Sequence, residues 1–272
     1  MDFTRELMWR VTRRKKSRLV RILAKRASIF SEYYNDYSYD FERNGEKLVL
    51  ARLTELQMNT VFDVGANVGD WARMARGYFP SATIHCFEIS SATFETLRKN
   101  LQEELFIKNN IGLSNTTGDV EYKDYGTNSG VNTIIKELTF HDSKVLGQTR
   151  KAHLTTGDDY CRMHNIDTID FLKIDVEGAE HMVLEGLNDM LKAGRVRCVQ
   201  FEYGYAHGDS KFLMRDFFSF FEDRNYAIGK LWSNGVDFGD FSYRLNDFKS
   251  GPNYIAVHNT DAAMIHVLTR RA

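Results

Sequence analysis

Short apolar runs alternate along the chain with longer segments in which apolar residues recur at helical spacing. The runs predict buried strands and the periodic segments predict amphipathic helices. The predicted strands are residues 60–64, 82–87, 105–113, 120–123, 151–155, 168–174, 197–203, 227–231 and 254–258. The predicted helices are residues 46–58, 70–79, 91–104, 158–164, 179–192 and 211–224.

This alternation of strands and helices predicts an α/β fold with a doubly wound, mainly parallel sheet. In such a sheet ligands bind beyond the carboxyl ends of the strands, where the strand order reverses. Polar residues that directly follow a predicted strand are therefore the first candidates for function.

The first 28 residues differ from the rest of the chain in charge. They contain ten Lys and Arg against two Asp and Glu, a balance of +8, while the remainder contains 26 against 35, a balance of −9. Met8, Val11, Leu19, Ile22 and Leu23 recur there at loosely helical spacing among the basic residues. The pattern predicts a basic helical arm at residues 1–45, ahead of a single domain at residues 46–272.

Four interpretations of this arm are open. A cationic amphipathic helix can lie on an anionic membrane surface, with residues 4–28 as the contact. It can also bind nucleic acid phosphates or acidic glycans, or it can pack on its own domain.

Composition restricts the cellular setting. No run approaches 18 apolar residues, and basic residues interrupt any signal-peptide core. Cys86, Cys161 and Cys198 form no CxxC pair, so neither a zinc site nor a disulfide framework is indicated. We expect idle or buried thiols and a cytoplasmic protein, which is peripheral at the inner face of the membrane if the arm binds lipid.

A small-residue loop follows the first predicted strand, with Asp63, Gly65, Asn67 and Gly69. Glycines let the backbone turn sharply and let a ligand approach closely, and the next helix offers free N–H groups. The GxxxG spacing departs from the dinucleotide fingerprint, and no GxxxxGK[ST] phosphate loop occurs. The carboxylate of Asp63 suits a cationic ligand group better than a pyrophosphate.

Glu88 ends the second predicted strand, 25 residues after Asp63. A carboxylate at this place can accept both hydroxyls of a ribose. The alternative is a cap for the helix that begins near Ser90. We favour the ribose role because the loop and the carboxylate occur together, one β–α–β unit apart.

This combination resembles class I S-adenosylmethionine-dependent methyltransferases, and four segments resemble the FkbM family among them. They are VFDVGANVG (61–69), NIGLS (110–114), IDFLKIDVEGAE (169–180) and VQFE (199–202). The resemblance implies a Rossmann-like, seven-stranded sheet and methyl transfer from S-adenosylmethionine, usually to a hydroxyl of a sugar or natural product. It places Asp63, Gly65, Asn67 and Gly69 in the cofactor loop, Glu88 on the ribose, and Gly112 and Leu113 near the adenine edge.

Acidic residues gather at two predicted strand ends, where Asp175, Glu177 and Glu180 follow one strand and Glu202 ends the next. Asp175 and Glu202 can orient the methionine ammonium and the substrate hydroxyls. Alternatively, Asp175, Glu177 and Glu202 can hold a divalent cation such as Mg²⁺ and so acidify a bound hydroxyl. Finally, Glu177 and Glu180 can simply favour the N-terminus of a helix.

An alcohol is a poor nucleophile, so a base or a metal is expected in its methylation. His207 lies on a glycine-flanked loop after a predicted strand and is a candidate general base, with a surface position as the alternative. Asp175 and Glu202 complete the candidate catalytic set. The polar stretch 125–148 suits a lid or substrate loop, or plain exposure to solvent.

The sequence therefore predicts an O-methyltransferase for a sugar, a glycolipid or polysaccharide, or a polyhydroxylated natural product, with an acceptor that can be lipid-linked. No Pro-Pro motif of base N-methylation follows the fourth strand, and a nucleic acid partner is disfavoured. The alternatives are an RNA ribose or other small-molecule methyltransferase, and a non-catalytic, cofactor-binding protein at a membrane surface.

Overall fold

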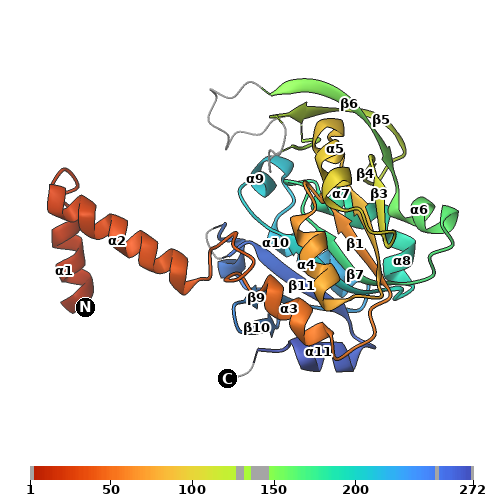
Figure 1. The fold of residues 1–272 in the computed structure, drawn as a ribbon. Coiled ribbons are helices and arrows are strands. Elements are labelled where there is room, and N and C mark those ends of the chain that lie inside the picture. Colours follow the sequence, from red (N-terminus) through yellow and green to blue (C-terminus); the bar gives the residue numbers. More distant parts are fainter. Residues whose placement is uncertain (1–2, 127–131, 136–146, 249–250, 271–272) are drawn as a thin grey trace.

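Eight strands form the main sheet of the molecule (Figure 1). The computed structural model describes residues 3–126, 132–135, 147–248 and 251–270. The strands of this sheet are β1 (Thr60–Val64), β2 (Thr83–Phe87), β3 (Phe106–Asn109), β7 (Ile169–Ile174), β8 (Val196–Glu202), β9 (Tyr226–Trp232), β10 (Gly235–Phe238) and β11 (Asn253–His258). Their spatial order is β10-β9-β11-β8-β7-β1-β2-β3.

Five neighbouring strands, from β3 to β8, are parallel. β11 pairs antiparallel with both β8 and β9, and β10 pairs antiparallel with β9. The prediction of a doubly wound, mainly parallel α/β sheet is confirmed. The sheet has one strand more than the seven that the resemblance implies, because the chain turns at residues 233–234 and pairs back on β9.

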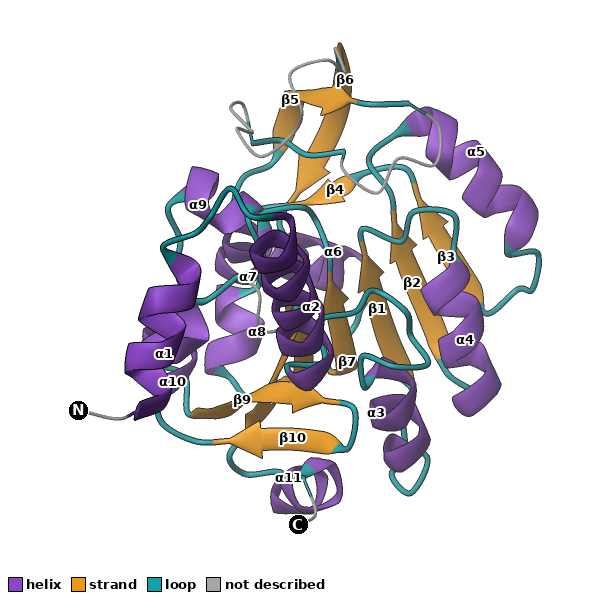
Figure 2. Cartoon of the chain, turned by 90° about the vertical axis from the view of Figure 1, so that its left-hand side faces the viewer, coloured by secondary structure: helices purple, strands orange, loops and turns teal. Residues whose placement is uncertain are grey.

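A second, three-stranded sheet lies beyond the carboxyl ends of the parallel strands (Figure 2). It consists of β4 (Gly112–Leu113), β5 (Gly118–Asp124) and β6 (Gln148–Thr155). The single strand predicted for residues 105–113 is therefore wrong, because only β3 stays in the main sheet. The chain leaves that sheet at Asn110, whose side-chain amide donates to the Glu88 carbonyl at 2.8 Å, and β4 then pairs with β6.

Helices cover both faces of the main sheet. α3 (Glu46–Leu53), α4 (Asp70–Tyr78), α5 (Ser91–Asn100) and α11 (Ala262–Leu268) pack on one face. The other face carries α6 (Gly157–Met163), α7 (Glu180–Gly186), α8 (Asn188–Lys192) and α10 (Met214–Glu222). α9 (Ala206–Ser210) follows β8, and a short 3₁₀ helix spans Tyr243–Asn246.

Alternating residues of each strand point to opposite faces of the main sheet and contribute to the hydrophobic cluster on each face. Val61 points into one hydrophobic cluster and Phe62 into the other, as the two-residue period of a strand requires. The helix predicted for 179–192 is divided at Leu187, whose φ of −110° departs from the helical value. All three cysteines are buried and unpaired, as expected.

The N-terminal arm projects from the domain as two helices, α1 (Phe3–Thr12) and α2 (Arg18–Tyr34) (Figure 1). No described residue of either helix is buried, and burial along the chain begins at Asn44. Within the described ranges, no helix combines the length and the apolar character that crossing a bilayer requires.

Asp170 ties the amino ends of three strands together. One of its carboxylate oxygens accepts from the backbone N–H groups of Asn59 and Thr60, at 2.8 and 3.0 Å. The other accepts from Arg197 on β8 at 2.9 Å. The substitution Asp170→Ala should lower the free energy of unfolding by about 2–4 kcal/mol, because it leaves two amides and a guanidinium short of an acceptor.

Urea denaturation measures this loss. Glu95→Ala, which removes an exposed ion pair with Arg98, is the control and should change stability little. Equal stability of Asp170→Ala and the unchanged protein would show that the three strand ends do not depend on this carboxylate.

Candidate active site

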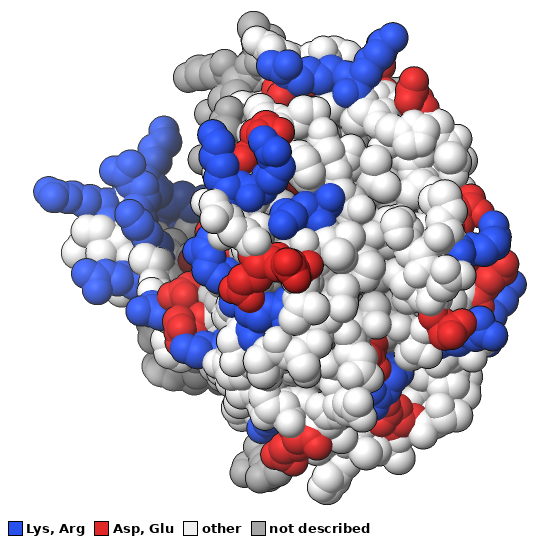
Figure 3. All heavy atoms as spheres, turned by 45° about the vertical axis from the view of Figure 1, so that its right-hand side comes forward, with Lys and Arg blue, Asp and Glu red and all other residues white. Residues whose placement is uncertain are grey.

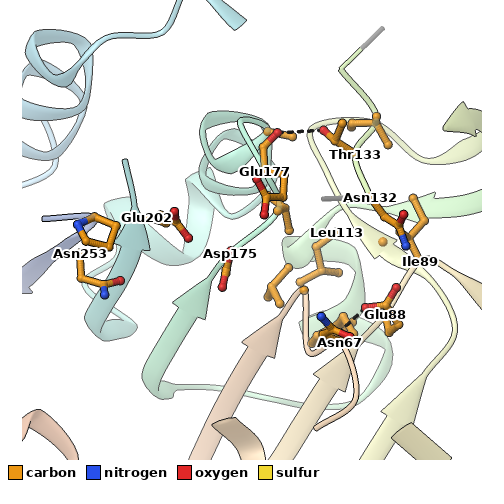
Figure 4. Close-up of a pocket in the computed structure, with 18 of the residues that line it drawn as sticks. Asn67, Glu88, Ile89, Leu113, Asn132, Thr133, Asp175, Glu177, Glu202 and Asn253 are labelled. Carbon is orange, nitrogen blue, oxygen red and sulfur yellow. Dashed lines mark hydrogen bonds between the residues drawn. The ribbon is translucent and has the colours of Figure 1, made fainter. Parts of the chain in front are cut away.

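A cavity of about 280 Å³ opens above the carboxyl ends of β1, β2, β7 and β8. It lies where the strand order reverses, between β1 and β7. Residues of segments 39–44 and 132–134, together with Pro252 and Asn253, complete its wall. Figure 4 shows Asn67, Glu88 and Leu113 at one end of this pocket, Glu202 and Asn253 at the other, and Asp175 between them.

The loop after β1 enters the pocket with backbone angles that favour glycine. Gly65 has φ +82°, and a Cβ there would overlap the carbonyl oxygen of Asp175. Asn67 also adopts a left-handed φ, +47°, and its side-chain oxygen is buried without a protein partner. Only glycine therefore allows the loop to approach β7 this closely, and the loop presents an unsatisfied polar atom at the pocket.

Glu88 is held at the end of β2 by two backbone donors. Its carboxylate accepts from the N–H of Asn67 at 3.0 Å and from that of Ser90 at 2.8 Å. Burial raises the pKa of Glu88 from 4.5 to about 7, although the two backbone hydrogen bonds oppose the shift. The carboxylate lines the pocket with lone pairs that remain available to ligand hydroxyls.

The N-cap of the helix that follows Glu88 is Ser90. Ser90 precedes α5, and its hydroxyl accepts from the N–H of Thr93 at 3.4 Å. Glu88 is therefore not the cap of this helix.

Lys173 lies beneath the pocket between two carboxylates. Its ammonium is 3.1 Å from Asp175 Oδ2 and 3.6 Å from Asp63 Oδ1. Burial alone would lower the pKa of Lys173, but the neighbouring carboxylates, led by Asp175, raise it above its usual value. Burial raises the pKa of Asp63 to about 6, and Lys173 limits that rise.

This arrangement corrects two of the predicted cofactor contacts. Asp63 is fully buried, and its charge faces Lys173 rather than a ligand. Gly69 adopts φ +88° at the start of α4 and abuts Leu101, so it shapes the turn behind the pocket. The other predicted cofactor residues do line the pocket, namely Gly65, Asn67, Glu88, Gly112, Leu113 and Asp175.

Asp175, Glu177 and Glu202 bring a concentration of negative charge to the pocket wall. Removal from water raises the pKa of Glu177 and of Glu202, and repulsion from Asp175 adds to both shifts. Among the residues with described positions, no group of three or more His, Cys, Asp or Glu is arranged to hold a metal ion. The predicted divalent-cation site is therefore not found among the described residues.

Glu180 supports the loop rather than the pocket. Its side chain is buried at the start of α7, and one carboxylate oxygen accepts from the N–H of Val176 at 2.9 Å. This hydrogen bond is made with the loop before α7 and not with the first N–H groups of the helix. It keeps the chain between β7 and α7 in place.

His207 is not at the pocket, contrary to the expectation for a general base. The imidazole is buried, its Nδ1 accepts from the N–H of Gly204 at 3.1 Å, and its Nε2 lies 2.9 Å from Glu180 Oε2. The ring packs between the aromatic rings of Tyr203 and Phe217. The glycine-flanked loop turns His207 inward, so its Nε2 faces Glu180 rather than the pocket.

Sequence reasoning missed the wall that faces Glu202. Asn253 begins β11 and pairs directly with Glu202 on β8. Because β11 is antiparallel to β8, its first residue lies at the carboxyl edge of the parallel strands, although it precedes a strand rather than follows one. Tyr39 and Phe41 also line the pocket, although they belong to the segment that joins the arm to the domain.

Glu46 holds together several side chains at the base of the pocket, next to this wall. Its buried carboxylate accepts from the side-chain amides of Asn44 at 2.6 Å, Gln200 at 2.7 Å and Asn253 at 3.2 Å. Burial raises the pKa of Glu46 above its ordinary value, and the charge of Lys173 and the amide donors of Gln200 and Asn44 act against that rise.

The polar stretch 125–148 contributes to the pocket through the part that has described positions. Asn132, Thr133 and Ile134 line the cavity, and the Thr133 hydroxyl donates to the Glu177 carbonyl at 2.9 Å (Figure 4). Residues 127–131 and 136–146, over which the predicted lid also extends, lie outside the described residues.

Comparison with known proteins points to one enzyme class. The model of the methyltransferase FkbM domain matches residues 63–228. A curated protein called Methyltransferase 1, from Beauveria bassiana (strain ARSEF 2860), is 26% identical over 147 residues, which make up 47% of this chain and 58% of that protein. The chain thus spans less than two thirds of the length of this relative.

Two solved structures resemble the chain at low identity. A crystal structure of a methyltransferase FkbM from Methylobacillus flagellatus KT has 14% identity and a TM-score of 0.46, over 74% of this chain and 44% of that one. The O-methyltransferase TomG from Streptomyces achromogenes, solved in complex with SAM, has 11% identity and a TM-score of 0.42, over 78% of each chain.

The raised pKa of Glu88 predicts a pH-dependent stability. Between pH 4.5 and about 7 the folded protein holds a proton on Glu88 that the unfolded chain has released, so the free energy of unfolding falls as the pH rises. Glu88→Gln should remove up to about 1.4 kcal/mol per pH unit from this downward slope.

Urea denaturation at a series of pH values measures the slope. Glu95→Gln on the exposed side of α5 should leave it unchanged. An unaltered slope in Glu88→Gln would mean that Glu88 titrates normally in the folded protein.

Proposed function

Because this chain belongs to the FkbM family of methyltransferases, we propose that it transfers a methyl group from S-adenosylmethionine to a hydroxyl of a sugar or another polyhydroxylated acceptor. The observation that carries the acceptor class is the acidic, amide-lined half of the pocket around Glu177, Glu202 and Asn253.

The residues present at the Glu88 end fit S-adenosylmethionine. The glycine cradle at Gly65 leaves room that a Cβ would fill, and the buried side-chain oxygen of Asn67 lacks a protein partner. The carboxylate of Glu88 is fixed by two amides and would accept the two ribose hydroxyls. Apolar residues beside it would enclose the adenine, and they include Ile89, Ile111, Leu113 and Leu154.

Asp175 supplies the negative charge nearest the centre of the pocket. Its carboxylate is oriented by Lys173 at 3.1 Å and remains partly exposed, so it can accept from the ammonium of the amino acid portion of the cofactor. When bound, S-adenosylmethionine supplies an electrophilic methyl group on a positively charged sulfur. The surrounding carboxylates favour that positive charge electrostatically.

The far half of the pocket suits an uncharged acceptor with several hydroxyls. Carboxylate and amide groups accept and donate hydrogen bonds to hydroxyls, and no Lys, Arg or His occurs among the described residues that line the cavity. A polyanion such as RNA would meet Glu177 and Glu202 with like charge. This contrast favours a polyhydroxylated acceptor over a nucleic acid.

Glu202 is the group that we assign to the acceptor proton. Its pKa is raised by removal from water and by repulsion from Asp175, which makes the carboxylate a stronger base than an exposed glutamate. Asn253 stands opposite Glu202 in the β8–β11 pair and can hold a neighbouring hydroxyl. The chain thus orients the acceptor and takes up its proton, and positioning supplies the remaining catalysis.

Calorimetry with S-adenosylmethionine tests the cofactor end. Glu88→Ala should weaken binding at least tenfold, because a fixed acceptor for two hydroxyls is lost. Glu95→Ala is the control, since Glu95 is exposed on α5. Undiminished binding by Glu88→Ala would overturn the ribose assignment.

Transfer of labelled methyl groups into a crude glycan extract tests the acceptor end. Glu202→Gln should reduce turnover by roughly 10²–10⁴-fold, while its affinity for S-adenosylmethionine stays within about threefold of the original, as calorimetry would show. Full turnover in Glu202→Gln would exclude this residue as the base. Transfer into protein or RNA, but not into glycans, would refute the proposed acceptor class.

A further inference from the structure

The helical arm carries an apolar face that the domain does not cover. Leu19, Leu23, Phe30 and Tyr34 share one side of α2, and each is more than 60% exposed. The rings of Phe30 and Tyr34 stack with centroids 6.2 Å apart, which makes this face continuous at its C-terminal end. A helix that packs on its own domain would bury such a face.

The opposite side of α2 is polar and carries Arg21, Lys25, Ser28 and Glu32. Over residues 3–34 the arm holds ten Lys and Arg against two acidic residues, while the chain as a whole has a net charge of −1. Figure 3 shows lysine and arginine side chains crowded on the part of the molecule that projects at its left. Positive charge and apolar area therefore occur together on one projecting element.

This combination fits one kind of surface. A lipid bilayer with anionic headgroups offers negative charge above an apolar interior, and a helix with both features lies along that boundary. Phosphates of a nucleic acid would engage the cations but would leave Leu23 and Phe30 in water. A second copy of the arm would cover the apolar face but would bring two strongly positive segments together.

We propose that α1 and α2 anchor this protein to an anionic membrane surface, with Leu19, Leu23, Phe30 and Tyr34 inserted at the headgroup boundary. Cations of the arm, including Lys15 and Lys16 in the turn between the helices, contact the headgroups. Each basic residue near the surface adds to this attraction, most strongly at low salt.

The anchor joins the domain beside the pocket. Asp36, two residues after α2, accepts from the backbone N–H of Ser233 at 2.8 Å and fixes the base of the arm to the β9–β10 turn. Three residues farther along, Tyr39 lines the pocket, followed by Phe41. If the proposed methyl transfer holds, an acceptor presented at the membrane surface would meet this wall of the pocket first.

Vesicle flotation of the full chain tests the anchor. Vesicles of 30% phosphatidylglycerol in phosphatidylcholine should carry the protein, and pure phosphatidylcholine vesicles should carry much less. Raising NaCl from 0.05 to 0.5 M should weaken the binding severalfold, because the attraction to the headgroups is screened.

Two matched substitutions separate insertion from simple charge attraction. Leu23→Glu and Ser28→Glu each add one negative charge to α2, on the apolar and the polar side respectively. Leu23→Glu should reduce binding to the anionic vesicles more than tenfold, and Ser28→Glu less than threefold. Both positions are exposed, so both variants should keep the melting temperature of the domain.

Equal losses in the two variants would overturn the insertion of the apolar face. Tighter binding to a single-stranded RNA homopolymer than to the vesicles, at the same salt, would overturn the choice of partner. A dimer in sedimentation that only Leu23→Glu dissociates, without vesicle binding, would assign the face to a second copy. Vesicle binding requires no methyl transfer, so failure of the anchor and failure of the proposed activity are distinguishable.

Discussion

A single buried ammonium allows the strand ends of this protein to carry so many carboxylates. Lys173 projects from the central strand β7 and lies within 3.6 Å of both Asp63 on β1 and Asp175. An isolated charge in that position would be strongly unfavourable, so each of the three groups depends on the others. The same contacts fix the two strands on either side of the point where the strand order reverses, and so they set the floor of the pocket.

The positive charge of Lys173 does not balance all the carboxylates of the site. Glu46, Glu88, Glu177 and Glu202 surround the same cavity, and burial raises the pKa of each of them. A ligand that brings positive charge or hydroxyl donors to this pocket would therefore stabilise the ionised carboxylates. The arrangement favours the sulfonium and ammonium groups of the proposed cofactor at one end, and a hydroxylated acceptor at the other.

The parallel half of the sheet and its end-of-strand residues could be predicted from the sequence. Gly65, Glu88 and Asp175 each follow an apolar run, and parallel strands bring such positions to one edge. The direction of a side chain was harder to predict. Asp63 immediately precedes the loop but still lies within β1, and its side chain faces Lys173 rather than the pocket. His207 turns into the core because the chain after β8 folds back as a short helix.

Residues from distant parts of the chain could not be predicted in the same way. Asn253 starts an antiparallel strand, and Tyr39 belongs to a segment with no strand or helix pattern. Their place in the wall depends on strand order and on the path of the connection, which local periodicity does not determine. The division of 105–113 between two sheets depends likewise on the pairing of β4 with the remote β6.

β11 follows β8, β9 and β10 in the sequence, so the main sheet can be completed only late in the synthesis of the chain. β11 is inserted between β8 and β9, and it supplies the pairing that connects the β9–β10 hairpin to the rest of the main sheet. As the ribosome extends the nascent polypeptide, the sheet edge at β8 therefore stays open until residues 253–258 have left the exit tunnel. Until then the growing chain exposes an unpaired strand edge. Such an edge can pair with other chains and aggregate, and chaperones bind chains in this state.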